Sequence, residues 1–228
     1  MAAPILEATA LTHLFGLTPV LDDLDFSIAP GRAAVIVGRN GTGKSTLIRL
    51  FAGLLAPTSG TIRVYSDLAP RLTGPTRRRI GVMTHQSLLY PNLTARENLE
   101  FYARLYSIPD PRNTAIRLLD RVALSAHAAR RVRDLSRGTQ QKLSLARALI
   151  AEPDLILCDE PFTSLDSDAV SLATSILTDA LSRGRSVVIT AHAQLFPSPL
   201  EFDCWELSAG RLTRTDSDPP RQSRKAQA

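Results

Sequence analysis

The sequence predicts an α/β fold in which helices pack on a mostly parallel core sheet. Short apolar runs of strand length recur at 33–37, 155–158 and 186–190. Strands that are apolar at every position are typical of parallel sheets, because both faces of such a sheet are covered. Stretches with apolar residues at helical spacing separate these runs, and a long helical segment interrupts them at about 87–142.

The first part of the chain alternates strands and helices. Before residue 30, apolar residues alternate with polar ones, which predicts a strand exposed on one face; the apolar positions are Leu24, Phe26 and Ile28. Pro30-Gly31 predicts the turn that follows. The next expected elements are the buried strand at 33–37, ending at Gly38, a helix at about 44–54, and strands at 61–65 and 80–84.

The middle of the chain is expected to be helical. Thr94 and Glu97 have the S/T-x-x-E spacing of a capping box, which opens a helix. Pro109 and Pro111 are expected to end it, because proline disrupts a helix interior. The helices expected in this part are 94–106, 114–123 and one behind Gly138, with apolar residues at Leu143, Ala146 and Ile150.

The last part of the chain returns to alternation. A buried strand is expected at 155–158, then a helix that Asp166 caps, then a buried strand at 186–190. Residues 216–228 are polar and contain proline, which is typical of a disordered tail. Residues 1–215 are therefore expected to form a single domain, whose helical subdomain spans about 87–142.

Composition argues against several classes of function. The chain has 27 Lys and Arg against 22 Asp and Glu, a formal net charge of +5. Its arginine clusters at 77–79 and 130–133 lack interleaved aromatics, so a solvated face is favoured and no nucleic acid is expected. No run approaches the roughly 18 to 20 apolar residues of a membrane span. The start of the chain lacks the pattern of a secretory signal, and two cysteines without CxxC spacing predict neither a disulfide framework nor a zinc site.

A glycine-rich segment follows the first buried strand. It matches G-x-x-x-x-G-K-[ST], and its residues are Gly38, Arg39, Asn40, Gly41, Thr42, Gly43, Lys44, Ser45 and Thr46. Glycines let backbone N–H groups turn toward phosphate oxygens, Lys44 supplies positive charge to the β and γ phosphates, and the Ser45 hydroxyl can bind Mg²⁺. The helix behind the loop points its positive end at the same anion. The chain is therefore predicted to bind a nucleoside triphosphate.

Two adjacent carboxylates follow the apolar strand at 155–158. Neighbouring strand positions point to opposite faces, so Asp159 can hold Mg²⁺ while Glu160 polarises the attacking water as general base. Two solvated carboxylates at a strand end are the alternative, which the phosphate-binding loop disfavours. Cys158 is expected to be a small buried strand residue and not a nucleophile.

Further motifs stand between and after these two sites. They are Gln86 behind an expected strand, LSRGTQQK at 135–142 before a helix, SLD at 164–166, and His192 at the end of SVVITAH. In this order and spacing, residues 6–212 resemble the ATP-binding subunit of ABC transporters. The resemblance implies a P-loop NTPase fold (ABC ATPase) with an N-terminal antiparallel β-subdomain and a helical insert. It also implies an ATPase that uses ATP and Mg²⁺.

The resemblance implies a role for four further residues. Phe15 would stack on adenine, the alternative being a core phenylalanine. Gln86 would contact Mg²⁺ or the attacking water and report the nucleotide state to a membrane partner. His192 would bond the γ-phosphate, although it could equally be a solvated strand end. Asp166 would lie across a dimer interface, although a helix N-cap explains it as well.

One motif departs from the family. Where the family usually has Leu-Ser-Gly-Gly-Gln, this chain has Leu135-Ser136-Arg137-Gly138-Thr139. Ser136 and Gly138 are retained, so the hydroxyl and the close backbone approach to a γ-phosphate remain. Arg137 and Thr139 stand in place of a glycine and a glutamine, which bears on the rate of catalysis more than on docking.

The resemblance also implies partners. Each subunit's signature would close over ATP held by the other subunit, which requires a homodimer. A separate integral membrane permease would complete the transporter, placing the chain on the cytoplasmic face of the bacterial inner membrane. The stretches 84–99, 160–166 and 191–195 look most like the ATPase of the haem exporter of cytochrome c maturation.

Three alternatives stay open. The chain could serve another small-substrate exporter, because substrate choice lies in the membrane subunits. A soluble ABC-type ATPase acting on nucleic acid or ribosomes is disfavoured, since only about 90 residues separate Thr46 from Leu135 and one cassette is present. A regulatory module without turnover is disfavoured by the intact Lys44, Asp159, Glu160 and His192.

Overall fold

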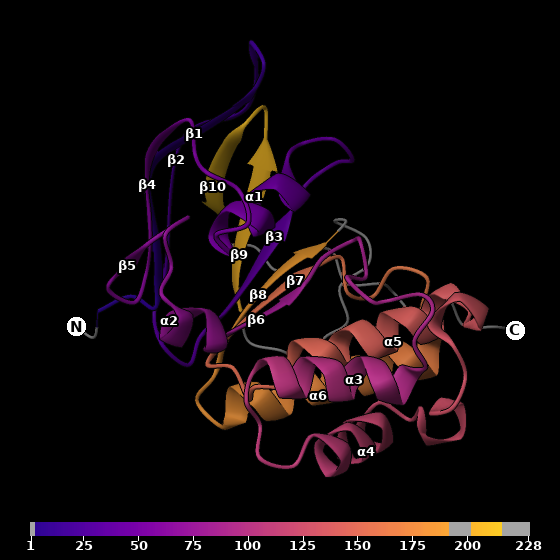
Figure 1. Cartoon of the computed structure of the whole chain (residues 1–228). Helices are drawn as coiled ribbons and strands as arrows, with labels where there is room; N and C mark the ends of the chain where they lie inside the picture. The colour runs from indigo at the N-terminus through magenta and orange to yellow at the C-terminus, as the bar shows by residue number, and fades with distance from the viewer. Residues whose placement is uncertain (1–2, 192–201, 216–228) are drawn as a thin grey trace, which may run out of the picture.

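Two β-sheets and a layer of helices form the described part of the chain, residues 3–191 and 202–215 of this computed structural model (Figure 1). The larger sheet has six strands in the order β10-β9-β3-β8-β7-β6. Their bounds are Ala33–Val37 (β3), Ile80–Met83 (β6), Leu155–Asp159 (β7), Ser186–Ala191 (β8), Asp203–Ser208 (β9) and Arg211–Thr215 (β10). All adjacent pairs are parallel except β9 and β10. The expected mostly parallel core sheet is confirmed.

The smaller sheet is antiparallel and comes from the N-terminal part of the chain. Its order is β2-β1-β4-β5, with bounds Leu6–Phe15 (β1), Thr18–Ile28 (β2), Ser59–Val64 (β4) and Asp67–Leu68 (β5). Gly60 marks a close approach in this sheet. Its φ is +79°, and a Cβ there would collide with the backbone of Ala10. The N-terminal antiparallel β-subdomain is therefore confirmed.

Alternate residues of the core strands enter two separate hydrophobic clusters. In β3, Val35 and Val37 join one cluster, whereas Ala34 and Ile36 join the other. The first cluster also takes its apolar residues from the helices after β6, and the second takes them from the antiparallel sheet and the first helix. Both faces of the sheet are thus covered, which explains why these strands are apolar at every position.

Six α-helices lie in the described residues, four of them gathered on one side of the core sheet (Figure 1). The bounds are Lys44–Phe51 (α1), Gly74–Arg78 (α2), Ala95–Leu105 (α3), Pro111–Arg121 (α4), Arg137–Ala148 (α5) and Ser167–Ser182 (α6). The capping box of Thr94 and Glu97 is present at α3, with both hydrogen bonds formed. Asp166 caps α6 by accepting from Ala169 N at 2.8 Å.

Helix α4 begins three residues earlier than the periodicity predicts. Pro111 is its first residue and Asp110 caps it, accepting from Asn113 N at 3.0 Å. Proline suits this position, because its φ is already helical and the missing N–H would have no partner there. Pro111 therefore starts a helix instead of breaking one.

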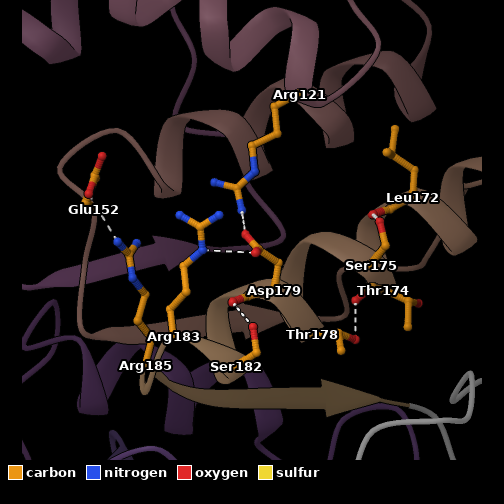
Figure 2. A network of polar contacts seen from close by, with 10 residues as sticks. All are labelled: Arg121, Glu152, Leu172, Thr174, Ser175, Thr178, Asp179, Ser182, Arg183 and Arg185. Carbon is orange, nitrogen blue, oxygen red and sulfur yellow. Dashed lines mark hydrogen bonds and ion pairs between the residues drawn. The ribbon is translucent and has the colours of Figure 1, made fainter.

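Asp179 connects α6 to α4 of the helical insert (Figure 2). Its carboxylate accepts from Arg121 of α4 at 2.6 Å and from Arg183 at the end of α6 at 2.9 Å. Because all three side chains are partly exposed, these ion pairs contribute little to stability. No helix within the described residues is long and apolar enough to cross a membrane. His192 and the tail at 216–228 lie outside the described residues.

Candidate nucleotide-binding site

The glycine-rich loop connects β3 at the centre of the core sheet to α1. Lys44, the first residue of α1, is only 4% exposed. Its Nζ donates to Gly38 O at 2.9 Å and to Arg39 O at 3.0 Å. The ammonium group therefore lies inside the curve of the loop, where it can meet a phosphate.

Two glycines of the loop are required by geometry. Gly43 has a φ of +102°, and a Cβ there would lie 2.9 Å from Val20 Cγ1. A Cβ at Gly38 would lie 2.6 Å from Leu207 O. Side chains at these positions would push the loop away from its neighbours, so the pattern of glycines follows from the path of the backbone.

Asp159 ends β7 as a buried carboxylate, 1% exposed. Its Oδ1 accepts from Thr190 Oγ1 at 2.8 Å, but its Oδ2 is buried without a hydrogen-bond partner among the described residues. A buried carboxylate oxygen is costly unless a donor or a cation satisfies it. Oxygen donors also suit Mg²⁺, which binds one or two carboxylates together with substrate phosphates. The position therefore fits the magnesium ion expected from the sequence.

Glu160 follows the end of β7 in a left-handed backbone conformation, with φ +50°. Its N–H donates to Thr190 O and Thr190 Oγ1, both at 3.1 Å. Its Oε1 lies 3.4 Å from Lys44 Nζ. Because the chain leaves the strand at Glu160, this turn directs the carboxylate to the glycine-rich loop, and the alternation of strand faces does not apply.

Thr190 is a site residue that the sequence reasoning missed. From β8 it bonds both the Asp159 side chain and the Glu160 backbone. The signal available was a hydroxyl at the end of the apolar run at 186–190, beside two carboxylates on the neighbouring strand.

Phe15 lies at the end of β1 and is 53% exposed, which excludes the core alternative. Its ring meets that of His13 edge to face, with centroids 4.9 Å apart. The hairpin that follows carries Val20 against Gly43 of the loop. Phe15 therefore offers an exposed ring face close in the chain to residues that contact the loop.

The signature residues lie at the start of α5. Ser136 caps the helix, accepting from Thr139 N at 3.3 Å. A Cβ at Gly138 would lie 2.9 Å from Ser164 O, so this glycine permits a close contact with the segment after Glu160. Among the described residues, no hydrogen bond or ion pair joins residues 136–139 to 38–46. This separation fits a signature that serves a second subunit.

A polar cavity of about 220 Å³ lies beside Glu160. Arg137 and Gln141 of α5 line it together with His85. Gln141 Nε2 donates to Glu160 O at 3.2 Å, so α5 also holds the turn that carries Glu160. The sequence neighbours of Gln86, His85 and Ser87, line this cavity. Gln86 itself is exposed and does not line it.

Comparison with known proteins identifies the family. A family model described as "ABC transporter" matches residues 21–163, more than half of the chain. The chain belongs to the ABC transporter family. The match runs from β2 through the glycine-rich loop, the signature helix and the two carboxylates, so the resemblance seen in the sequence is confirmed.

Two groups of relatives stand out within the ABC transporter family. The "Nod factor export ATP-binding protein I" of Paraburkholderia xenovorans is 36% identical over 84% of this chain and 64% of its own length. The "Cytochrome c biogenesis ATP-binding export protein CcmA" of Xylella fastidiosa is 38% identical over 87% of this chain and 92% of its own length. The chain spans just under two thirds of the Paraburkholderia relative.

Solved ABC cassettes have the same fold. The dimeric post-hydrolysis state of the cassette MJ0796, bound to ADP and Pi, superposes with a TM-score of 0.81 at 25% identity. The superposition covers 92% of this chain and 97% of MJ0796. The α/β architecture of a P-loop ABC ATPase is therefore confirmed.

Proposed function

We propose that this chain is the ATP-hydrolysing subunit of an ABC transporter, working as a homodimer with a separate membrane permease. One observation carries the proposal. The ends of β3 and β7 bring together the Lys44 ammonium, the Glu160 carboxylate and the buried Oδ2 of Asp159, which has no hydrogen-bond partner among the residues that the structure describes. These are the groups that phosphoryl transfer from a nucleoside triphosphate requires.

The side chains divide the chemistry among them. Lys44 exchanges its carbonyl partners for oxygens of the β and γ phosphates of ATP. Ser45 and Asp159 would hold Mg²⁺, which neutralises charge on the phosphates when it is bound. Glu160 accepts a proton from the attacking water, and the Thr190 bonds to its backbone keep the carboxylate near the loop.

A homodimer supplies the remaining contacts. Ser136 and Gly138 would approach the ATP of the partner subunit, with Phe15 stacked on adenine and Gln86 near the γ-phosphate. The exposed start of α5 supports this arrangement, as does the solved MJ0796 cassette, which is dimeric and bound to ADP and Pi. His192 is proposed to bond the γ-phosphate.

A membrane permease is the proposed partner of the helical insert. Tyr90, Phe101 and Leu105 present exposed apolar surface on and beside α3. The rings of Tyr90 and Phe101 pack edge to face with centroids 4.8 Å apart, so the exposed side chains are contiguous. Contiguous exposed apolar patches mark interaction sites. Binding there would hold the chain on the cytoplasmic face of the inner membrane.

We propose haem export for cytochrome c maturation as the transport process. The Xylella relative named for cytochrome c biogenesis supports it, since the match covers 92% of that protein. Export of another small substrate is the second candidate, because the relatives named for Nod factor export have a sequence identity to this chain close to that of the Xylella relative.

Isolation of the full-length chain from its own membranes in mild detergent tests the transport process. Haem-handling membrane subunits should co-purify with the wild-type chain. Recovery of a permease without haem would favour the second candidate. Recovery of ribosomes or DNA in place of any membrane protein would contradict the transporter assignment.

A further inference from the structure

Arg147 is a buried arginine of α5 that the roles described so far do not use. Its side chain is only 8% exposed. No carboxylate in the ranges 3–191 and 202–215 forms an ion pair with it. Burial lowers the pKa of its guanidinium from the ordinary value. A buried cation without a counter-ion is costly, so its presence requires a reason.

The guanidinium of Arg147 connects two elements to α5. One Nη donates to Val82 O in β6 at 2.5 Å, while its Nε finds no partner within the described chain. Its Cζ lies 5.2 Å from the centre of the Tyr102 ring of α3, within the range of a cation–π contact. The edge strand β6 and helix α3 are thus both tied to α5 through one side chain.

The segment after β6 is held by neighbours of Arg147 on the same two helices. Ser144 Oγ of α5 donates to Ser87 O at 3.3 Å, and the Tyr102 hydroxyl donates to Leu88 O. Asn98 of α3, fully buried, accepts from Tyr90 N at 2.8 Å and donates to Tyr90 O at 3.1 Å. The main chain at Ser87, Leu88 and Tyr90 is therefore held by side chains of α3 and α5.

Gln86 lies directly before these ties, and its side chain is exposed. Its own carbonyl accepts from Thr84 Oγ1. Helix α5 begins at Arg137, immediately after Ser136, and ends against β6, where a Cβ on Gly81 would collide with Ala148 O. The helix therefore contacts β6 with its C-terminal end and Ser87 through Ser144 in its middle, and it carries the signature at its N-terminal end.

We propose that Arg147 is a positioning residue that fixes the Gln86 segment to the signature helix. With the Tyr102 hydroxyl, it keeps Gln86 in a set relation to the first turn of α5, so that the response to ATP in one site reaches the signature that serves the other. This inference rests on the proposed function, because Gln86 acts only if the chain hydrolyses ATP. A purely structural arginine would stabilise the fold without acting through Gln86.

Steady-state ATP hydrolysis by the full-length chain tests the role. Arg147→Met keeps the apolar stem and removes the guanidinium, and we expect kcat to fall about tenfold while KM changes less than about twofold. Arg147→Lys retains a donor for Val82 O and should recover part of kcat. Arg183→Met is the matched control. It removes a partly exposed arginine at the far end of α6 (Figure 2) and should leave kcat unchanged.

A double-mutant cycle with Gln86→Ala separates positioning from stability. If Arg147 acts through Gln86, Arg147→Met should change kcat less than about twofold in the Gln86→Ala background. Equal losses of kcat in both backgrounds, or a loss in KM and thermal stability alone, would overturn the proposal. Should Arg147→Met fail to fold, Tyr102→Phe removes a single hydroxyl and should lower kcat about threefold, again only when Gln86 is present.

The outcomes also distinguish a failure of this inference from a failure of the proposed ATPase function. A wild-type chain that hydrolyses no ATP would overturn both. Wild-type turnover together with full activity of Arg147→Met and Tyr102→Phe would overturn the inference and leave the ATPase assignment in place.

Discussion

Lys44 Nζ and Glu160 Oε1 lie 3.4 Å apart, with Lys44 at the start of α1 and Glu160 just after β7. The lysine also bonds two carbonyls of its own loop. A bound phosphate would therefore compete with the Glu160 carboxylate for the Lys44 ammonium group. This ion pair keeps the proposed general base beside the proposed position of the γ-phosphate.

Lys44→Ala should abolish ATP binding. The change removes the positive charge inside the loop and also the two bonds that shape it, so affinity should fall at least about 100-fold. Equilibrium dialysis with labelled ATP measures the affinity. Arg63→Ala, at an exposed position of β4, is the control and should bind ATP normally. Unchanged affinity in Lys44→Ala would contradict the role of the loop.

Glu160→Gln should bind ATP, but its rate of ATP hydrolysis should be lower than that of the wild-type chain by about 100-fold or more. The amide keeps the size of the carboxylate but cannot accept the proton, so an ATP-bound dimer should accumulate. Light scattering coupled to size-exclusion chromatography detects this dimer. Glu152→Gln, at an exposed carboxylate paired with Arg185, should behave as the wild-type chain. A fully active monomeric Glu160→Gln would disprove the assignment of the base.

Thr190→Val should destabilise the nucleotide-free chain by about 1–3 kcal/mol, because the buried Asp159 carboxylate loses its donor. Valine has nearly the shape of threonine, so packing changes little. Urea unfolding measures the free energy of unfolding. Thr178→Val removes a hydroxyl that bonds a carbonyl within α6 and is the control. An equal loss of stability in the two variants would show that the hydrogen bond to Asp159 stabilises the fold no more than the bond within α6 does.

Phe15→Ala should weaken ATP binding about tenfold, since stacking on a base contributes about 1–3 kcal/mol. Leu17→Ala, at the same hairpin and 97% exposed, should leave affinity unchanged. Titration with a fluorescent ATP analogue measures both variants. If the two substitutions weaken binding equally, the effect belongs to the hairpin and not to the aromatic ring.

Cys158 should resist alkylation in the folded chain. Burial raises the pKa of its thiol to about 12, and the neighbouring Asp159 carboxylate acts in the same direction. At pH 8 the reactive thiolate is therefore scarce as well as inaccessible. Mass spectrometry after iodoacetamide treatment measures labelling, which should appear at this position only after denaturation. Rapid labelling of the native chain would show that the strand is exposed.

The sequence predicts best those elements whose signal is local. The buried strands at 33–37 and 186–190 follow from continuous apolar runs, and the capping box at Thr94 and Glu97 forms as expected. The start of α4 was misplaced because proline has opposite meanings at the first turn and in the interior of a helix. Strands β9 and β10 went unpredicted. Strand β9 pairs with the distant β3, whereas β10 pairs with the adjacent β9, and neither strand is a continuous apolar run.

The site follows the same rule. Lys44 and Asp159 are recognisable because each stands in a short sequence motif. Lys44 is part of the glycine-rich segment, and Asp159 follows an apolar run directly. Thr190 and Arg147 act through residues on other strands and helices, with which they share no short sequence pattern. The orientation of Glu160 depends on one left-handed residue after a strand, which the carboxylate pair alone does not reveal.

The apolar residues of the core sheet divide between its two faces. Helix α1 packs in one cluster, whereas α3, α4, α5 and α6 pack in the other. The backbone of the core strands lies between the two clusters. A substitution that opens a cavity under the four helices should therefore leave the packing of α1 intact.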